Sequence, residues 1–312
     1  MTMKKTSKIY VAGHRGMVGS GIVRRLQSAG YTNLITRTRQ ELDLLDQRST
    51  HDFVRAEKPK YIFLAAAKVG GIHTNNTYRA DFIYENITIQ NNVIHGALAA
   101  GVKDLCFLGS SCIYPRDCPQ PIKEDYLLTG PLEQTNEPYA IAKIAGIKLC
   151  ESCNRQYGTR FVSVMPTNLY GPNDNYDLAN SHVLPALIRK AHEAKMRGDK
   201  ELIVWGSGSP RREFLYVDDM ADACIFLMEQ GINEGIYNIG WGRDITIRQL
   251  AETVMNVVGF QGGIVFDASK PDGTPQKLLD VSRMANLGWN AKISLEEGIA
   301  KAYAAYLELS SN

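Results

Sequence analysis

A regular alternation of short apolar runs with longer amphipathic stretches constrains the fold of this chain more than any other feature. Each run has the length of a buried strand, and each stretch repeats apolar residues at helical spacing. This alternation predicts right-handed crossovers and a parallel sheet that helices cover on both faces. The first half of the chain is therefore predicted to form an α/β, doubly wound parallel sheet. The expected strands are 9–12, 34–36, 61–65, 105–108 and 161–165, and the expected helices are 17–29, 49–57 and 82–100.

The alternation loosens after residue 170, where polar, turn-rich stretches occupy residues 171–180 and 206–210. We interpret residues 1–170 as the first domain and residues 171–312 mainly as a smaller substrate-binding lobe. Some segments of this second part are expected to return to the first domain. Its expected strands are 202–205 and 236–239, and its expected helices are 183–195, 220–229, 247–257 and 295–307.

The composition is that of an ordinary globular protein, with 44% hydrophobic residues, 22% charged residues and a formal net charge of +2. Proteins that follow a phosphate backbone concentrate basic residues, so nucleic acid is not an expected partner. No stretch approaches the roughly 18 apolar residues of a membrane span. The apolar run after the lysines of residues 1–8 is also too short for a signal peptide. We therefore expect a cytoplasmic protein with no membrane partner.

The six cysteines are expected to be reduced thiols, because disulfides are rare in cytosolic proteins. Cys150 and Cys153 form a C-x-x-C pair, which elsewhere can indicate a metal or redox site. No second pair and no histidine cluster accompanies them, and both lie within an expected helix. We interpret them as structural and expect no bound metal.

A glycine-rich turn joins the first expected strand to the first expected helix. Glycines at such a turn let the backbone approach a pyrophosphate closely, at the positive end of the helix. The spacing G-x-x-G-x-x-G favours a Rossmann-type domain of the short-chain dehydrogenase kind over a plain glycine-rich turn. The residues predicted to bind the cofactor here are Gly13, His14, Arg15, Gly16, Met17, Val18 and Gly19.

The end of the second expected strand indicates which dinucleotide binds. An NAD site places Asp or Glu about 20 residues beyond the glycines, where it holds the ribose 2′-hydroxyl. Here the strand ends in Thr36-Arg37-Thr38-Arg39, and a guanidinium binds the 2′-phosphate that a carboxylate would repel. Arg15 is a second candidate for this phosphate, and the alternative is that these arginines are solvated surface residues. The pattern favours NADPH.

Tyr139 and Lys143 are predicted to share one face of a helix that begins near Pro138. A nearby ammonium lowers the pKa of a phenol and lets it exchange a proton with a carbonyl oxygen. Ser110 follows the fourth expected strand, at the edge of the sheet where such folds bind ligands. Its hydroxyl could hydrogen-bond the same carbonyl. Together with the glycine turn, these residues predict an oxidoreductase.

These motifs resemble the GDP-L-fucose synthase family of extended short-chain dehydrogenases, which act on nucleotide sugars. The similarity runs along nearly the whole chain and includes the second lobe. Residues 136–158 follow the family pattern, except that Cys153 stands where the family has Tyr. The other matching phrases are AGHRGMVGS at 12–20, AAAKVGGI at 65–72, NNTYRADFIYEN at 75–86, LGSSCIYP at 108–115, SVMPTNLYGPNDN at 163–175 and DASKPDGTPQKLLDV at 267–281.

The resemblance implies a bifunctional enzyme that converts GDP-4-keto-6-deoxy-D-mannose to GDP-L-fucose. Such an enzyme inverts C3 and C5 and reduces the C4 ketone with NADPH. The ketone acidifies the C3 and C5 protons, and inversion needs an acid and a base with pKa values near neutrality. The resemblance assigns these roles to Cys112 and His182. By residue type alone, a buried structural cysteine and a helix-capping or surface histidine would be favoured.

The resemblance also implies the remaining contacts and a homodimer formed through helices 82–100 and 138–157. Lys190 stands where some relatives have Arg, and its role is the least defined. Trp205 and Arg212, taken singly, could instead be a core residue and a surface charge. The further cofactor residues are Arg39, Asp43 and Leu44 toward the adenosine, Leu108, Gly109, Lys143 and His182, and Pro166, Thr167, Asn168 and Leu169 beside the nicotinamide. The residues expected to face the GDP-sugar are Lys190, Trp205, Arg212 and Lys277.

Two other readings of the same motifs are open. A nucleotide-sugar dehydratase typically carries an Asp-Glu pair after the strand-four Ser or Thr, whereas this chain has Cys112-Ile113. Dehydratases and 4-epimerases also recycle a tightly bound NAD, which the arginines at 37 and 39 disfavour. A catalytically inactive, dinucleotide-sensing relative would commonly lack the Tyr or the Lys, and both are present.

Overall fold

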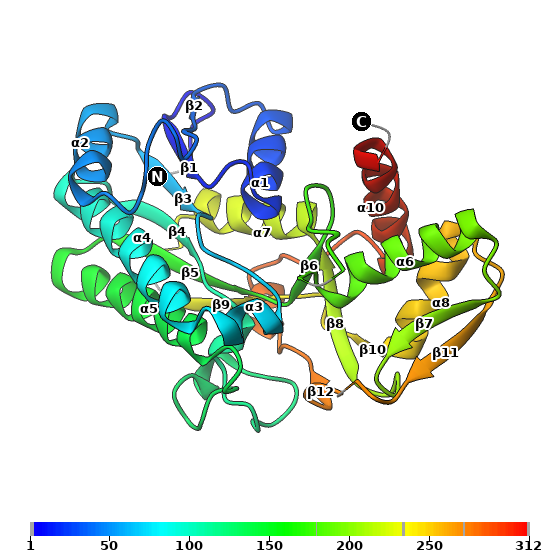
Figure 1. The fold of residues 1–312 in the computed structure, drawn as a ribbon. Coiled ribbons are helices and arrows are strands. Elements are labelled where there is room, and N and C mark those ends of the chain that lie inside the picture. The colour runs from blue at the N-terminus through cyan, green and yellow to red at the C-terminus, as the bar shows by residue number, and fades with distance from the viewer. Residues whose placement is uncertain (1–2, 179, 233–234, 271, 311–312) are drawn as a thin grey trace.

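The computed structural model describes residues 3–178, 180–232, 235–270 and 272–310. Its central feature is a six-stranded sheet in the order β2-β1-β3-β4-β5-β9, in which every neighbouring pair is parallel. The chain runs from β1 to β2 on one side and then to β3 on the other side of β1, so the strand order reverses beside β1 (Figure 1). Ligands of such sheets bind at the carboxyl ends of the strands at this switch point. The strands are β1 (Ile9–Ala12), β2 (Leu34–Ile35), β3 (Tyr61–Leu64), β4 (Asp104–Leu108), β5 (Arg160–Pro166) and β9 (Ile236–Ile239).

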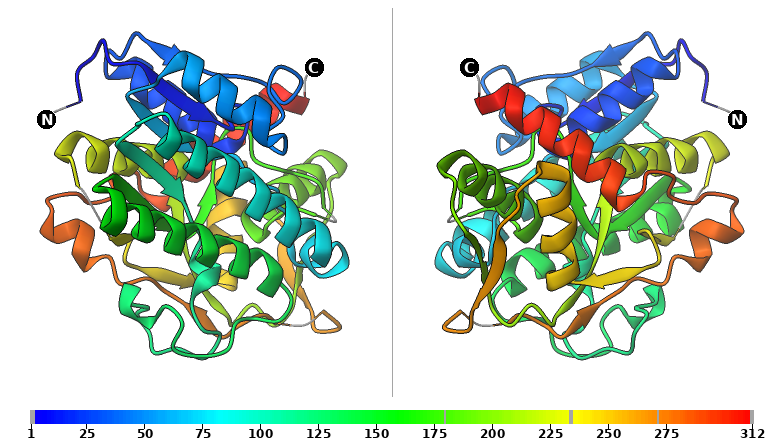
Figure 2. Two further views of the ribbon diagram at one scale, coloured as in Figure 1. Left: turned by 90° about the vertical axis from the view of Figure 1, so that its left-hand side faces the viewer. Right: turned by 90° about the vertical axis from the view of Figure 1, so that its right-hand side faces the viewer.

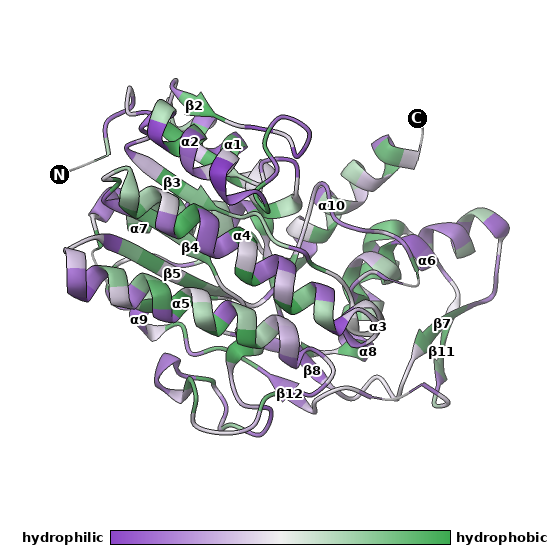
Figure 3. Cartoon of the chain, turned by 60° about the vertical axis from the view of Figure 1, so that its left-hand side comes forward, coloured by the Kyte–Doolittle hydropathy of each residue, from purple (hydrophilic) through white to green (hydrophobic). Residues whose placement is uncertain are grey.

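Helices cover both faces of this sheet, so the predicted α/β doubly wound fold is confirmed. On one face α2 (Gln47–Glu57), α4 (Arg79–Ala99) and α5 (Glu137–Tyr157) lie side by side, with the short α3 (Ile72–Thr77) preceding α4. Figure 3 shows the mixed hydrophilic and hydrophobic colouring of α4 and α5, as expected of helices with one buried side. The other face carries α1 (Met17–Ser28) and α7 (Val217–Gln230), which contact each other.

The second lobe contains two small sheets and three helices around a core of its own. Its central strand, β8 (Arg211–Tyr216), pairs with β6 (Asn168–Tyr170), β10 (Asp244–Thr246) and β12 (Gln276–Lys277). A separate parallel pair consists of β7 (Glu201–Trp205) and β11 (Gly263–Asp267). The helices are α6 (Val183–Arg197), α8 (Ile247–Val258) and α10 (Leu295–Ser310), and Figure 2 shows α8 and α10 next to each other.

Two segments that follow residue 170 pack with the first sheet and its helices. Strand β9 extends the sheet beyond β5, and α7 packs against α1. The short α9 (Ser282–Asn286) contacts β9. Among the described residues, no helix is both long enough and apolar enough to span a bilayer.

Candidate active site

The glycine turn lies where the sequence predicts it, between the end of β1 and the start of α1. Gly13 has a φ of +84°, and a Cβ on it would lie 2.6 Å from the backbone nitrogen of Ala66. A Cβ on Gly19 would lie 2.1 Å from the carbonyl oxygen of Gly13. These two positions therefore exclude side chains for internal steric reasons. A Cβ on Gly16 would meet nothing closer than 3.5 Å, so the fold itself does not require glycine there.

The two arginines after β2 differ in their contacts. Arg37 forms a 3.1 Å ion pair with Glu57 and donates to the carbonyl oxygen of Thr36, so its guanidinium is engaged within the protein. The Arg39 side chain is 72% exposed, and Asp43 approaches it at 3.9 Å. Arg15 is also exposed, on the turn before α1. Of these three arginines, Arg39 and Arg15 are therefore more accessible to a phosphate than Arg37.

Ser110 and Cys112 lie immediately beyond the carboxyl end of β4. Gly109 donates a backbone hydrogen bond to Val164 of β5, and Met165 would collide with any side chain at Gly109. Ser110 begins a single 3₁₀ turn, η1 (Ser111–Ile113), and its Oγ accepts a 3.3 Å hydrogen bond from the backbone nitrogen of Cys112. The hydroxyl and the thiol are thereby held on one tight turn.

Tyr139 and Lys143 occupy the first turns of α5, next to that loop. The Lys143 ammonium donates a 2.8 Å hydrogen bond to the carbonyl oxygen of Leu108 and lies 5.6 Å from the centre of the Tyr139 ring. Burial lowers the pKa of Lys143 to about 8, while the Cys112 thiolate opposes this shift. Burial and the Cys112 charge raise the pKa of Tyr139 above its ordinary value. The pKa of Tyr139 is therefore raised and not lowered as expected, because desolvation disfavours the charged form of the phenol.

Lys277 interacts electrostatically with both Cys112 and His182, although the three residues come from distant parts of the sequence. Burial raises the pKa of the Cys112 thiol, and Lys277 is the strongest influence in the opposite direction. His182 precedes α6 and makes no capping hydrogen bond. Its side chain keeps access to solvent, yet the desolvation caused by surrounding protein, followed by the Lys277 charge, lowers its pKa. A cation thus favours the thiolate of Cys112 and the neutral imidazole of His182.

The four residues expected to face the GDP-sugar fall into two pairs. The Lys190 ammonium lies 4.6 Å from the centre of the Trp205 ring, and Trp205 is 52% exposed at the end of β7. Arg212 and Lys277 are register partners on the parallel strands β8 and β12. Burial lowers the pKa of Arg212, with Asp272 as the opposing charge. Trp205 is therefore not a core residue, and Arg212 is not a freely solvated surface charge.

The residues expected beside the nicotinamide lie where β5 passes into β6. Thr167 donates from Oγ1, and Asn168 from Nδ2, to the backbone carbonyl oxygen of Glu213 on β8. Pro166 ends β5 and Leu169 lies within β6. This link connects the first sheet to the central strand of the second lobe.

Two buried polar residues near these groups have no counterpart in the sequence-based site. Glu213 is fully buried and accepts hydrogen bonds from the backbone nitrogens of Gly242 and Leu279. Asn238, on β9, is also fully buried. For Asn238, the signal available in the sequence was a lone polar residue within an apolar strand, Tyr237-Asn238-Ile239. This pattern gives no indication of its hydrogen-bond partners.

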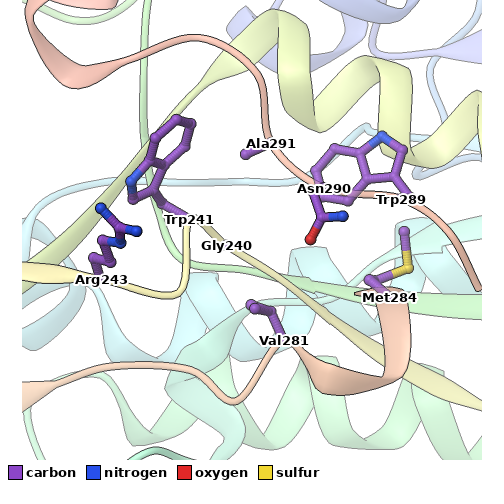
Figure 4. Close-up of a pocket in the computed structure, with 8 residues that line it drawn as sticks. All are labelled: Gly240, Trp241, Arg243, Val281, Met284, Trp289, Asn290 and Ala291. Carbon is purple, nitrogen blue, oxygen red and sulfur yellow. The ribbon is translucent and has the colours of Figure 1, made fainter. Parts of the chain in front are cut away.

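A pocket of about 210 Å³ lies apart from the candidate site, beyond the carboxyl end of β9. Figure 4 shows Trp241 and Arg243 on one side of it and Trp289 and Asn290 on the other. None of the predicted site residues lines it.

Comparison with known proteins agrees with this fold. The model of the NAD dependent epimerase/dehydratase family matches residues 9–240. GDP-L-fucose synthase 1 of Arabidopsis thaliana is 60% identical, covering 97% of this chain and 94% of the relative. GDP-L-fucose synthase of Escherichia coli K12 is 57% identical, covering 96% and 97%. The solved structure of a GDP-L-fucose synthetase from Naegleria fowleri bound to NADP is 28% identical and superposes with a TM-score of 0.92, covering 100% of this chain and 96% of that one.

The chain belongs to the NAD dependent epimerase/dehydratase family, whose members use a nicotinamide dinucleotide. Its sheet order and its glycine turn are those of a dinucleotide-binding fold. Within that family, its relatives place it among the GDP-L-fucose synthases, and its substrate is a GDP-sugar.

Proposed function

We propose that the protein converts GDP-4-keto-6-deoxy-D-mannose to GDP-L-fucose, by epimerising C3 and C5 and reducing C4 with NADPH. The observation that carries this proposal is the pairing of two chemical groups at one loop. Ser110 belongs to the carbonyl-reducing group, and Cys112, two residues further on, is electrostatically linked to Lys277, as His182 is. A simple reductase has no use for the second group.

The residues present fit a phosphorylated dinucleotide. The side-chain-free surface at Gly16 lies at the amino end of α1, where backbone N–H groups and the helix dipole favour a pyrophosphate. Arg39 and Arg15 are available for the 2′-phosphate that distinguishes NADPH from NADH. When bound, the cofactor supplies the hydride for C4.

In the reduction, Ser110 and Tyr139 would both hydrogen-bond the C4 oxygen, and Tyr139 would give it a proton. A nearby cation makes that transfer easier, because it stabilises the phenolate that remains. Lys143 meets this need, since its ammonium is fixed by the Leu108 carbonyl oxygen close to the Tyr139 ring. The positions of these three groups support their roles.

In the epimerisation, one group removes a proton from C3 or C5 and the other delivers a proton to the opposite face. Cys112 and His182 are suited to this exchange, because neither holds a permanent charge near neutral pH. Lys277 acts to lower the pKa of both groups, so it eases proton release from whichever of them serves as the acid. Arg212 and Lys277 would neutralise the pyrophosphate, with Lys190 and Trp205 further along the GDP moiety.

A homodimer and a cytoplasmic location complete the proposal. Helices α4 and α5 lie side by side on one face and expose the large side chains of Tyr84 and Ile141, 68% and 40% accessible. Exposed apolar side chains on paired helices support association through this face. Light scattering coupled to gel filtration measures the mass directly, and a monomer at micromolar concentration contradicts the dimer.

The decisive experiment supplies GDP-4-keto-6-deoxy-D-mannose and NADPH in deuterated water and identifies the product by NMR. We expect GDP-L-fucose with deuterium at C3 and C5 and one NADPH consumed per product. Product without net NADPH consumption would indicate a 4-epimerase or dehydratase. NADPH binding without turnover would indicate a sensor.

A further inference from the structure

The side chain of Asn238 uses both its oxygen and its amide nitrogen to join three segments of the chain. Its Oδ1 accepts a 2.6 Å hydrogen bond from the hydroxyl of Tyr114. Its Nδ2 donates to the carbonyl oxygens of Ile122, at 2.9 Å, and Asp280, at 3.2 Å. A buried amide with both donors and its acceptor engaged fixes its partners firmly, because any displacement leaves a polar group unsatisfied away from water.

Two of these partners belong to the loop that carries the thiol. Tyr114 directly follows the 3₁₀ turn of Cys112 and is itself buried. The turn is therefore held by the Ser110 hydroxyl at its start and by the Tyr114 hydrogen bond to β9 at its end. Ile122 lies at the far end of the same loop, so Asn238 holds both ends of it.

The third partner, Asp280, lies three residues beyond Lys277, which ends β12. Beyond β12, the chain runs parallel to the end of the thiol loop. Ile122 donates from its backbone nitrogen to Leu278 and accepts from Asp280. Asn238 closes this arrangement from β9, since its amide binds Ile122 and Asp280 together. The Asn238 side chain thus adds to these backbone hydrogen bonds and ties both segments to β9.

The relative position of these two segments matters because the charges around Cys112 are few. Lys277 acts on the thiol from β12, and Lys143 acts on it from α5. Tyr139, also on α5, is uncharged at neutral pH and is affected by the thiolate in turn. Lys277 is the larger of the two cationic influences, so a small movement of its strand changes the acidity of the thiol.

We propose that Asn238 and Tyr114 are positioning residues for epimerisation, which hold the Cys112 loop and the Lys277 strand in their working arrangement. They touch neither substrate nor cofactor in this scheme. Their part in epimerisation rests on the proposed function, whereas their effect on the Cys112 thiol does not. Tyr139 and Lys143 are anchored separately, by α5 and the Leu108 carbonyl oxygen. The reduction therefore depends less on the hydrogen bonds of Asn238 and Tyr114.

The test compares Tyr114→Phe, which removes one hydrogen bond and keeps the ring, with Asn238→Ala. The first readout is the rate of Cys112 alkylation by iodoacetamide at pH 6 to 10, followed on the Cys112 peptide by mass spectrometry. We expect the apparent thiol pKa to rise in both variants, because Lys277 no longer faces Cys112 in the same way. The second readout is deuterium entry at C3 and C5, which should fall about 10- to 100-fold, the range expected for small misplacement of reacting groups.

Tyr31→Phe is the matched control. Tyr31 is equally buried and also donates its phenolic hydrogen bond within the protein, to Glu229, but it lies outside the loop and strand at issue. This variant should leave both readouts unchanged. NADPH affinity should stay the same in all three variants. A folded Tyr114→Phe protein with wild-type alkylation and exchange overturns the proposal even if Asn238→Ala fails to fold.

The two readouts separate the effect of Asn238 and Tyr114 on the Cys112 thiol from the enzyme activity. Alkylation needs no substrate, so it tests the positioning of Cys112 by itself. If the wild-type protein exchanges no deuterium with the GDP-sugar, the proposed function fails, and the alkylation profile still decides whether Asn238 and Tyr114 set the environment of the thiol.

Discussion

The ammonium of Lys143 donates a 2.8 Å hydrogen bond to the carbonyl oxygen of Leu108, which joins the start of α5 to the end of β4. The two halves of the carbonyl-reducing group lie on these two elements: Tyr139 on the helix and Ser110 just past the strand. The bond therefore keeps the phenol and the hydroxyl in register with each other, in addition to fixing the cation.

Replacing Tyr139 by Phe is expected to lower the rate of NADPH oxidation by roughly 10²- to 10⁴-fold, because the proton donor for the C4 oxygen is lost. The epimerising residues remain, so deuterium should still enter C3 and C5. Both rates come from one reaction in deuterated water, followed by absorbance and by NMR. Undiminished NADPH turnover would show that another group supplies the proton.

The lowered pKa of Lys143 predicts a loss of activity in mild alkali. Its ammonium is present below a pH of about 8 and is lost as the pH rises through that value. We expect kcat/KM for NADPH, which reports groups of the free enzyme, to fall as the pH rises through this value, giving an alkaline limb in the pH profile. The Lys143→Arg enzyme should be slower but should lack this alkaline limb, since a guanidinium stays charged. An identical limb in the Arg variant would assign the titration to another residue.

Arg39→Ala is expected to weaken NADPH binding about 10- to 150-fold, the cost of one charge-assisted hydrogen bond, while NADH binding stays nearly unaffected. Arg37→Ala is the control. Because the Arg37 guanidinium already binds Glu57, its removal should change the ratio of the two affinities little. Fluorescence titration measures both cofactors. Equal weakening of both by Arg39→Ala would make Arg15 the better candidate for the 2′-phosphate.

Cys112→Ala should nearly abolish deuterium exchange at C3 and C5 with little change in NADPH affinity. Cys112→Ser should be almost as poor, since a hydroxyl is a far weaker acid than a thiol. His182→Gln should abolish deuterium exchange and also weaken binding of the GDP-sugar. Cys118→Ala, on the same loop, serves as the control with normal exchange. Wild-type exchange in Cys112→Ala would reduce the thiol to a packing role.

The first sheet could be predicted from sequence because its strands are buried on both faces and therefore read as unbroken apolar runs, as in Tyr61–Leu64. The second lobe was harder. Strand β8 begins Arg211-Arg212-Glu213, which has no apolar pattern, and the backbone nitrogens of Gly242 and Leu279 donate to its buried carboxyl group. Such partners depend on the tertiary fold and leave no mark near residue 213.

The candidate site divides in the same way. The glycine turn and the Tyr139–Lys143 spacing are local patterns, so their place next to strand ends followed from the sequence. The approach of Lys277 to Cys112 depends on β12, a strand of two residues that no periodicity reveals. The opposing effect of burial on the pKa of Tyr139 also required the packed structure.

The hydrogen bond from the backbone nitrogen of Leu278 to the Gln120 side chain links positions 158 residues apart. A chain made from its amino end will have the glycine turn and α5 outside the ribosome long before this contact can form. The glycine turn and the start of α5 can therefore form before residues 276–280, which contact the end of the thiol loop, have been made. A truncated protein that ends before β12 would keep Lys143 near Cys112 but would lack Lys277, so the proposed epimerising group would be incomplete while the proposed reducing group could already be in place.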